Sequence, residues 1–165
     1  MKLRKYKKED ANEIIKWIRN ETELLLWSAN IYNKFPLKVE DINKFYEECS
    51  KKSKFYPMTL IENKKIIGHL ILRNVDEKNE IIRLGFIIID PNLRGQGHGK
   101  NLVNLAIDYA KNKLNAKEIN LGVFENNTSA YYCYKSAGFK EDNKPKERFK
   151  INNEEWNCVE LIYSK

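Results

Sequence analysis

Three glycines at alternate positions, Gly95, Gly97 and Gly99, separate an apolar run from an amphipathic pattern. The run at residues 81–89 has the length of a buried strand, and residues 100–115 carry Leu, Val and Ala at helical spacing. Because glycine adopts positive φ without strain, the N–H groups of such a loop can converge on an anion. The helix that begins there adds the positive end of its dipole. The segment therefore predicts a strand, a phosphate-binding loop and a helix.

Two common phosphate-binding motifs do not fit this loop. A Walker A motif requires GxxxxGK[ST], but the residue five positions before Gly99 is Arg94, and Asn101 follows Lys100. The dinucleotide fingerprint GxGxxG fails because the third glycine comes one residue early. Its context also differs, since the preceding strands are joined as hairpins and not as a βαβ unit. A glycine-rich turn without a ligand is the structural alternative.

The remaining pattern predicts alternating strands and helices. The expected elements are a strand over 2–6, a helix starting at Asp10, a helix over 38–50, strands over 55–61, 65–73 and 81–89, a helix over 100–115, a strand over 118–124, a helix over 128–137, a strand from Phe139 and a strand over 156–163. The apolar stretch from Leu24 to Phe35 has no period and is expected to be irregular.

The connections fix how these strands pair. The three strands before the glycine loop are joined by short turns and must be antiparallel. The following helix can act as a crossover, which makes strand 118–124 parallel to strand 81–89. We expect one domain over 1–165 with an α+β fold: a mixed, mostly antiparallel central sheet with helices on both faces.

Composition excludes several classes of protein. Three widely spaced cysteines and two histidines predict neither a disulfide framework nor a metal site. The N-terminus is charged and no apolar run is long enough for a membrane span, so we expect a cytoplasmic protein without a membrane partner. The net charge of +7 comes from dispersed lysines, which favours a solvated surface over specific nucleic-acid binding.

The glycine segment also resembles a known family motif. Arg94-Gly95-Gln96-Gly97-His98-Gly99 is similar to the [QR]xxGx[GA] pyrophosphate loop of the GNAT superfamily of N-acetyltransferases, and Ile89-Asp90-Pro91 resembles the family's lead-in. The element order predicted above is also that of the family. The resemblance implies that main-chain N–H groups of this loop hold the pyrophosphate of CoA. It also implies that the preceding strand binds the pantetheine arm in β-sheet fashion, where neighbouring strands splay apart. The implied cofactor-binding residues are Ile87, Ile88, Ile89, Arg94, Gly95, Gln96, Gly97, His98, Gly99, Lys100 and Asn127.

A second motif follows about forty residues later. Asn127…Ala130…Tyr134…Gly138-Phe139 is similar to the family signature N-x-x-A-x-x-x-Y-x-x-x-G-F. A spacing of seven residues puts Asn127 and Tyr134 on one helix face. Taken alone, Tyr134 would be read as a buried aromatic residue. The resemblance implies that Asn127 contacts the pantetheine arm and that Tyr134 is catalytic, with its hydroxyl directed at the thioester sulfur.

The resemblance implies an activity, which is direct transfer of an acetyl group from acetyl-CoA, the co-substrate, to a primary amine of a small molecule or a peptide N-terminus. Tyr134 would act as general acid, and a main-chain N–H of residues 87–89 would stabilise the oxyanion. No covalent enzyme intermediate is required, so Cys133 is expected to be a core residue. A CoA-binding or protein-interaction module without turnover is the alternative function.

Part of the site stays open at this point. Some relatives carry a glutamate where this chain has Gly122, so the general base could be Glu80, Glu125, Asp76, His69 or a water chain. We expect the acceptor pocket to form from residues 24–35 and 140–155. The acceptor's identity and the oligomeric state are not specified by the sequence, with a homodimer as one arrangement considered.

Overall fold

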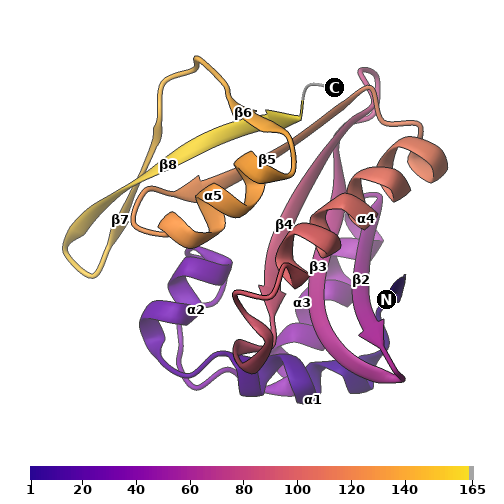
Figure 1. The fold of residues 1–165 in the computed structure, drawn as a ribbon. Coiled ribbons are helices and arrows are strands. Elements are labelled where there is room, and N and C mark those ends of the chain that lie inside the picture. The colour runs from indigo at the N-terminus through magenta and orange to yellow at the C-terminus, as the bar shows by residue number, and fades with distance from the viewer. Residues whose placement is uncertain (164–165) are drawn as a thin grey trace.

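One mixed β-sheet organises the computed structural model, which describes residues 1–163 (Figure 1). Its order is β1-β2-β3-β4-β5-β8-β6, and β7 pairs with β8. The strands are β1 (Lys2–Lys5), β2 (Phe55–Glu62), β3 (Lys65–Asp76), β4 (Ile81–Ile89), β5 (Glu118–Phe124), β6 (Phe139–Glu141), β7 (Glu147–Ile151) and β8 (Glu154–Tyr163). Within the described residues, β4 and β5 are parallel and the other pairs are antiparallel. The predicted fold class is confirmed.

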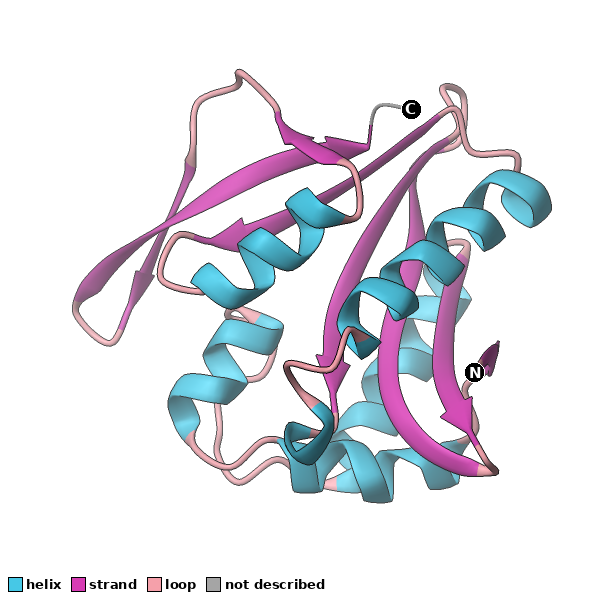
Figure 2. Ribbon diagram, in the orientation of Figure 1, coloured by secondary structure: helices cyan, strands magenta, loops and turns pink. Residues whose placement is uncertain are grey.

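Helices cover both faces of this sheet (Figure 2). They are α1 (Ala11–Ile14), α2 (Glu21–Ser28), α3 (Val39–Lys52), α4 (His98–Leu114) and α5 (Thr128–Ser136). The helices α4 and α5 pack on one face, whereas α1, α2 and α3 pack on the other. No helix within residues 1–163 is long and apolar enough to cross a membrane.

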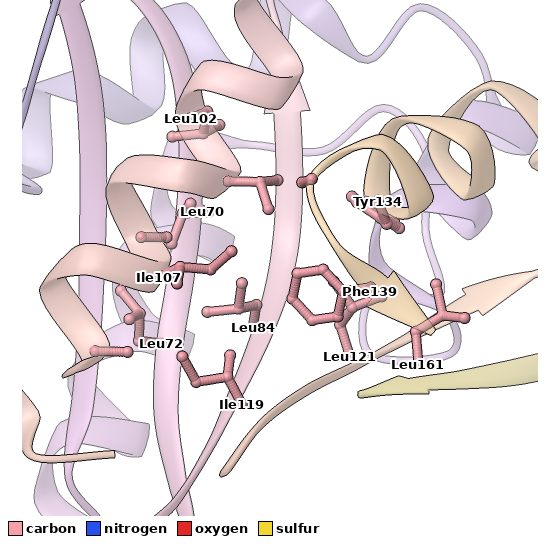
Figure 3. Packing of buried hydrophobic residues seen from close by; sticks show 14 of the residues in the cluster. Leu70, Leu72, Leu84, Leu102, Ile107, Ile119, Leu121, Tyr134, Phe139 and Leu161 are labelled. Atoms are coloured by element: carbon pink, nitrogen blue, oxygen red, sulfur yellow. The ribbon is translucent and has the colours of Figure 1, made fainter. Parts of the chain in front are cut away.

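The larger core lies between α4, α5 and the sheet (Figure 3). Leu84 of β4, Leu102 of α4 and Phe139 of β6 are each at most 2% exposed. Burying a side chain of this size contributes roughly 1.5–3 kcal/mol relative to leaving it in water. Phe86 and Ile88, also from β4, point into the second core beneath α1 and α3. The strand is therefore covered on both faces, as its apolar sequence predicts.

The N-terminal half contains one helix that the sequence pattern does not predict. Helix α2 occupies Glu21–Ser28 and overlaps the first five residues of the stretch 24–35 that was expected to be irregular. The side-chain oxygen of Asn20 accepts a hydrogen bond from Glu23 N (2.8 Å), which is an ordinary N-cap. Four consecutive apolar residues, 24–27, hide the helical period, because α2 is buried on more than one side. The expectation of irregular structure was wrong for residues 24–28.

Two other boundaries differ from the prediction. The helix expected from Asp10 is short, because α1 is flanked by 3-10 turns at Lys8–Asp10 and Ile15–Trp17. The strand expected from Phe139 is two strands, β6 and β7, separated by residues 142–146. Asn152 and Asn153 both have positive φ and form the turn that joins β7 to β8.

The sheet opens between its two parallel strands. Strands β4 and β5 pair only at Ile81–Glu118, Ile82–Ile119 and Arg83–Asn120, and beyond this point their ribbons diverge (Figure 1). From residue 84 onward, β4 is hydrogen-bonded to β3 and has no pairing with β5. The main-chain groups on the side of β4 that faces β5 therefore form an unpaired strand edge.

Candidate active site

A cavity of about 940 Å³ surrounds the unpaired edge of β4. It touches the loop before α4 and the inner side of α5, and it continues to aromatic residues of α2, α3 and β7. Ten of the twelve predicted site residues line it: Ile87, Ile88, Ile89, Arg94, Gly95, Gly97, Gly99, Lys100, Asn127 and Tyr134. The fold thus brings the two sequence motifs to one cavity.

The glycine loop exposes main-chain donors to this cavity. Gly95 and Gly97 have φ values of 76° and 83°, which favour glycine, and no atom lies within 4 Å of the position that a Cβ would take at either residue. Gly97 is the N-cap of α4, and the Asn101 N–H donates to its carbonyl (3.0 Å). The N–H groups of residues 98–100 therefore have no acceptor within the helix. This arrangement suits a phosphate group.

The side chains around the loop are unequal in their access to the cavity. Arg94 and Lys100 line it, but Gln96 and His98 do not. The Gln96 amide lies 3.4 Å from the carbonyl oxygen of Asn92, and His98 Nδ1 is buried without a partner among residues 1–163. Any contact of Gln96 and His98 with a ligand would thus come from their main-chain groups.

A bulge interrupts β4 in the middle of the cavity. Gly85 lies opposite Ile71 and Ile88 lies opposite His69, so two residues of β4, Phe86 and Ile87, face one residue of β3. Phe86 has a φ of 48°, outside the usual strand region. A bulge leaves the extra residue out of the strand ladder. Main-chain N–H groups near residues 86–87 can therefore turn toward a ligand in the cavity.

Helix α5 presents Asn127 and Tyr134 to the same space. Asn127 is the N-cap residue by backbone geometry, yet its side chain makes no capping hydrogen bond. Tyr134 is 8% exposed, and its ring packs edge to face on Phe139 with centroids 6.4 Å apart (Figure 3). Within the described chain its hydroxyl has no hydrogen-bond partner. Burial, and to a lesser extent Cys133, raises the pKa of Tyr134, so the phenol is protonated at neutral pH.

The half of the cavity away from the glycine loop has aromatic walls and is called the aromatic half. They come from α2, α3 and β7, together with β2, β4 and β5: Trp27, Phe45, Phe55, Phe86, Phe124 and Phe149. Both segments expected to form an acceptor pocket, residues 24–35 and 140–155, contribute to this lining. A smaller cluster of Leu25, Phe124, Ile151 and Cys158 joins α2 to the β7–β8 hairpin and closes this end.

Three charged side chains in this half were not singled out from the sequence: Arg73, Arg83 and Glu147. Both Nη atoms of Arg83 donate to the Glu160 carboxylate, at 2.6 and 2.7 Å. The Arg83 guanidinium lies against Gly122, where a Cβ would come within 2.7 Å of its Nη2. The residue at position 122 must therefore be small for this ion pair to form. Because the three come from separate strands, only strand register brings them together.

The four residues considered as general base do not line the cavity. The carboxylates each have a surface partner: Glu80 with Lys117, Glu125 with Lys146 and Asp76 with Asn79. His69 is fully buried, and its Nε2 lies 2.7 Å from the Tyr46 hydroxyl. Desolvation lowers the pKa of His69 to about 3, so its ring is neutral. The carboxylates that do line the cavity are Glu23 and Glu147.

Of these two, Glu23 is already engaged. It accepts hydrogen bonds from the backbone and the guanidinium of Arg19, and Arg94 lies 3.6 Å away. The hydrogen bond from Arg19 is the main reason that the pKa of Glu23 is lowered. Glu147 has no ion pair within residues 1–163, so its carboxylate is the freer of the two.

The cavity combines a helix N-terminus with free main-chain N–H groups, a parallel strand pair that splays apart, and a tyrosine in its lining. These features suit an acyl-CoA-dependent transferase. The family model of the acetyltransferase (GNAT) family matches residues 12–139, more than half of the 165-residue chain. The chain therefore belongs to the GNAT acetyltransferase family. This confirms the predicted family, the N-acetyltransferase class and acetyl-CoA as the co-substrate.

Individual relatives are consistent with this assignment. An uncharacterized N-acetyltransferase of Methanocaldococcus jannaschii is 42% identical over 65 residues, which are 39% of this chain and 28% of that protein. A spermidine N(1)-acetyltransferase of Vibrio cholerae is 28% identical over 152 residues, covering 91% of this chain and 84% of that protein. The crystal structure of a V. cholerae spermidine N-acetyltransferase with CoA and spermine superimposes with a TM-score of 0.80. It is 22% identical and covers 97% of this chain and 92% of its own, which supports the fold.

Proposed function

We propose that this protein transfers an acetyl group from acetyl-CoA directly to a primary amine of a small molecule or a peptide N-terminus, at the cavity around β4. One observation carries the proposal: a single cavity touches the donors of the glycine loop, the side chain of Tyr134 and the aromatic half. In this arrangement the thioester and the amine approach each other at the bulge of β4. Acetyl-CoA supplies the reacting carbonyl group.

Cofactor binding uses the loop and the strand edge. The N–H groups at the start of α4 bind the pyrophosphate, with Arg94 and Lys100 adding positive charge. Residues 87–89 bind the pantetheine arm through main-chain groups that β5 leaves unpaired. The Asn127 side chain, free of any capping role, is available to the same arm.

Two groups act on the charge that develops during transfer. A main-chain N–H at the bulge of β4 donates to the carbonyl oxygen as negative charge builds on it. The Tyr134 hydroxyl donates to the departing sulfur. A thiol ordinarily has a pKa near 8.5, and the raised pKa of Tyr134 makes complete proton transfer from the phenol unfavourable. A strong hydrogen bond to the thiolate is therefore the larger part of its contribution.

The amine must lose a proton before or during attack. We assign this proton to Glu147, directly or through water, because this carboxylate lines the aromatic half and has no ion pair within the described part of the chain.

The cytoplasmic location expected from the sequence stays a prediction.

A polyamine is the second candidate acceptor. The curated relatives from Vibrio cholerae and Escherichia coli are spermidine N(1)-acetyltransferases, and they align over at least 91% of this chain. At 23–28% identity, this relation supports testing polyamines first but does not fix the acceptor.

The experiment is an acceptor screen with wild-type protein. Acetyl-CoA is mixed with polyamines, amino acids, aminoglycosides or peptides with free N-termini, and release of the CoA thiol is followed. We expect at least one class to raise the rate above that without acceptor, with one acetyl group gained by the amine. If CoA stabilises the fold while every amine leaves the rate unchanged, the protein is a CoA-binding module without turnover.

A further inference from the structure

A site for a polycation is expected to carry mainly carboxylates, but the aromatic half also contains two arginines. Arg73 of β3 and Arg83 of β4 lie directly opposite each other, and both line the cavity. Side chains at opposite positions on neighbouring strands have Cβ atoms about 4.5–5.5 Å apart, and like charges there are destabilising. The pair therefore places two arginine side chains on one wall of the cavity, where the Arg83 guanidinium extends over Gly122 of β5 to Glu160 of β8.

Only one of these two cations has a partner within residues 1–163. Arg83 is bound by both oxygens of Glu160, and its Nη1 also lies 3.2 Å from Asn120 Oδ1. Arg73 forms neither an ion pair nor a side-chain hydrogen bond within that range, and it stands exposed at the cavity rim. Its five N–H donors are thus available to a ligand, and an anion there would relieve the repulsion from Arg83.

The position of Arg73 relates it to the reacting atoms. Ile71 and Gly85, the next opposed pair on this face, lie two residues along each strand, which is about 7 Å. The bulge at Phe86 follows immediately. An anion bound by Arg73 and an amine at the bulge could therefore belong to one small molecule, with Phe45 and Phe55 beside its apolar part.

We infer that the acceptor is an amino carboxylate, whose amine is acetylated while its carboxylate binds Arg73 at the cavity rim. This inference rests on the proposed function and specifies its substrate class. It makes Arg73 a specificity-determining residue and disfavours a polyamine, one of whose positive charges would lie beside the Arg73 guanidinium.

The test compares matched acceptors that differ only in the carboxylate. The probes are 6-aminohexanoate with 6-aminohexanamide, and spermidine. For wild-type protein we expect kcat/KM to be at least about tenfold higher for a carboxylate than for its amide, the size of a charged hydrogen-bonded contact. Arg73→Gln should remove this preference, and Arg73→Glu should shift it toward the amide and spermidine.

A matched control is Arg148→Gln, which removes one positive charge from an exposed side chain of β7 outside the cavity and should leave the preference unchanged. Stabilisation by CoA should be the same in all variants, because Arg73 lies in the other half of the cavity. Equal kcat/KM for acid and amide in wild type, or a preference that survives Arg73→Gln, would overturn the inference while leaving the acetyltransferase proposal intact. Absence of acetylation with every probe and every amine of the screen would instead refute the proposed function.

Discussion

The ring of Tyr134 is packed in the core, and this residue also lines the cavity. Its hydroxyl has no hydrogen-bond partner within the described residues. Removing this oxygen by Tyr134→Phe keeps the packing against Phe139, so the stability of the fold should change little. If the hydroxyl donates to the departing sulfur, kcat should fall by about 10²-fold. The affinity for CoA should barely change, because the lost contact is made mainly in the transition state.

This prediction needs two measurements on the same variant: turnover with a good acceptor and equilibrium binding of CoA. The turnover measurement is made as a single-turnover experiment, so that the rate reports the chemical step and not product release. An unchanged rate of chemistry would make Tyr134 a packing residue, and another donor or solvent would then have to stabilise the departing thiolate.

At the scale of elements, the start of α4 should bind the pyrophosphate. A thermal-shift titration with CoA should raise the melting temperature of the wild type, and Gly97→Asp should abolish the rise because its carboxylate would repel the phosphates. Gly97→Ala separates charge from backbone strain: at a φ of 83° it should cost roughly 1–2 kcal/mol of stability but keep a response to CoA. Asn104→Asp, on the outer side of α4, is the charge control. A folded Gly97→Asp variant that responds to CoA like wild type would disprove the loop assignment.

How far the sequence predicts each element depends on whether its pattern is local. Helix α4 and the hairpins are predicted because period and turn residues agree within a few positions. Helix α2 is missed because it is buried between the second core and the β7–β8 hairpin, so residues 24–27 show no polar face. The sequence analysis does not identify Arg73, Arg83 and Glu147 for another reason. These residues come together only through the pairing of distant strands, and no sequence motif includes them.

For the whole molecule, the buried His69 should make stability depend on pH. Its pKa is about 3 in the folded state, below the ordinary value of about 6.5 expected in the unfolded chain. Stability from the neutral ring is therefore complete above pH 6.5 and is lost progressively as the pH falls toward 3. Between pH 6.5 and 5 the free energy of unfolding should drop by roughly 1.5 kcal/mol from this group alone.

Urea unfolding at several pH values measures this dependence. Each variant is compared by how its free energy of unfolding changes with pH, because a substitution also changes stability by an amount that does not depend on pH. In His69→Gln the decline between pH 6.5 and 5 should disappear, whereas His98→Gln, which changes the only other histidine, should retain it. An equal decline in wild type and His69→Gln would show that another group carries the effect.

The central claim, that one cavity passes the acetyl group directly from thioester to amine, bears on Cys133. This thiol lines the cavity next to Tyr134, and burial raises its pKa, so it is a poor nucleophile at neutral pH. The most direct measurement is quenched-flow mass spectrometry of both protein and acceptor during turnover. The account predicts one acetylated amine for each CoA thiol released, with the mass of the protein unchanged at every time point. An acetyl group on the protein that forms and decays at the rate of turnover would contradict direct transfer.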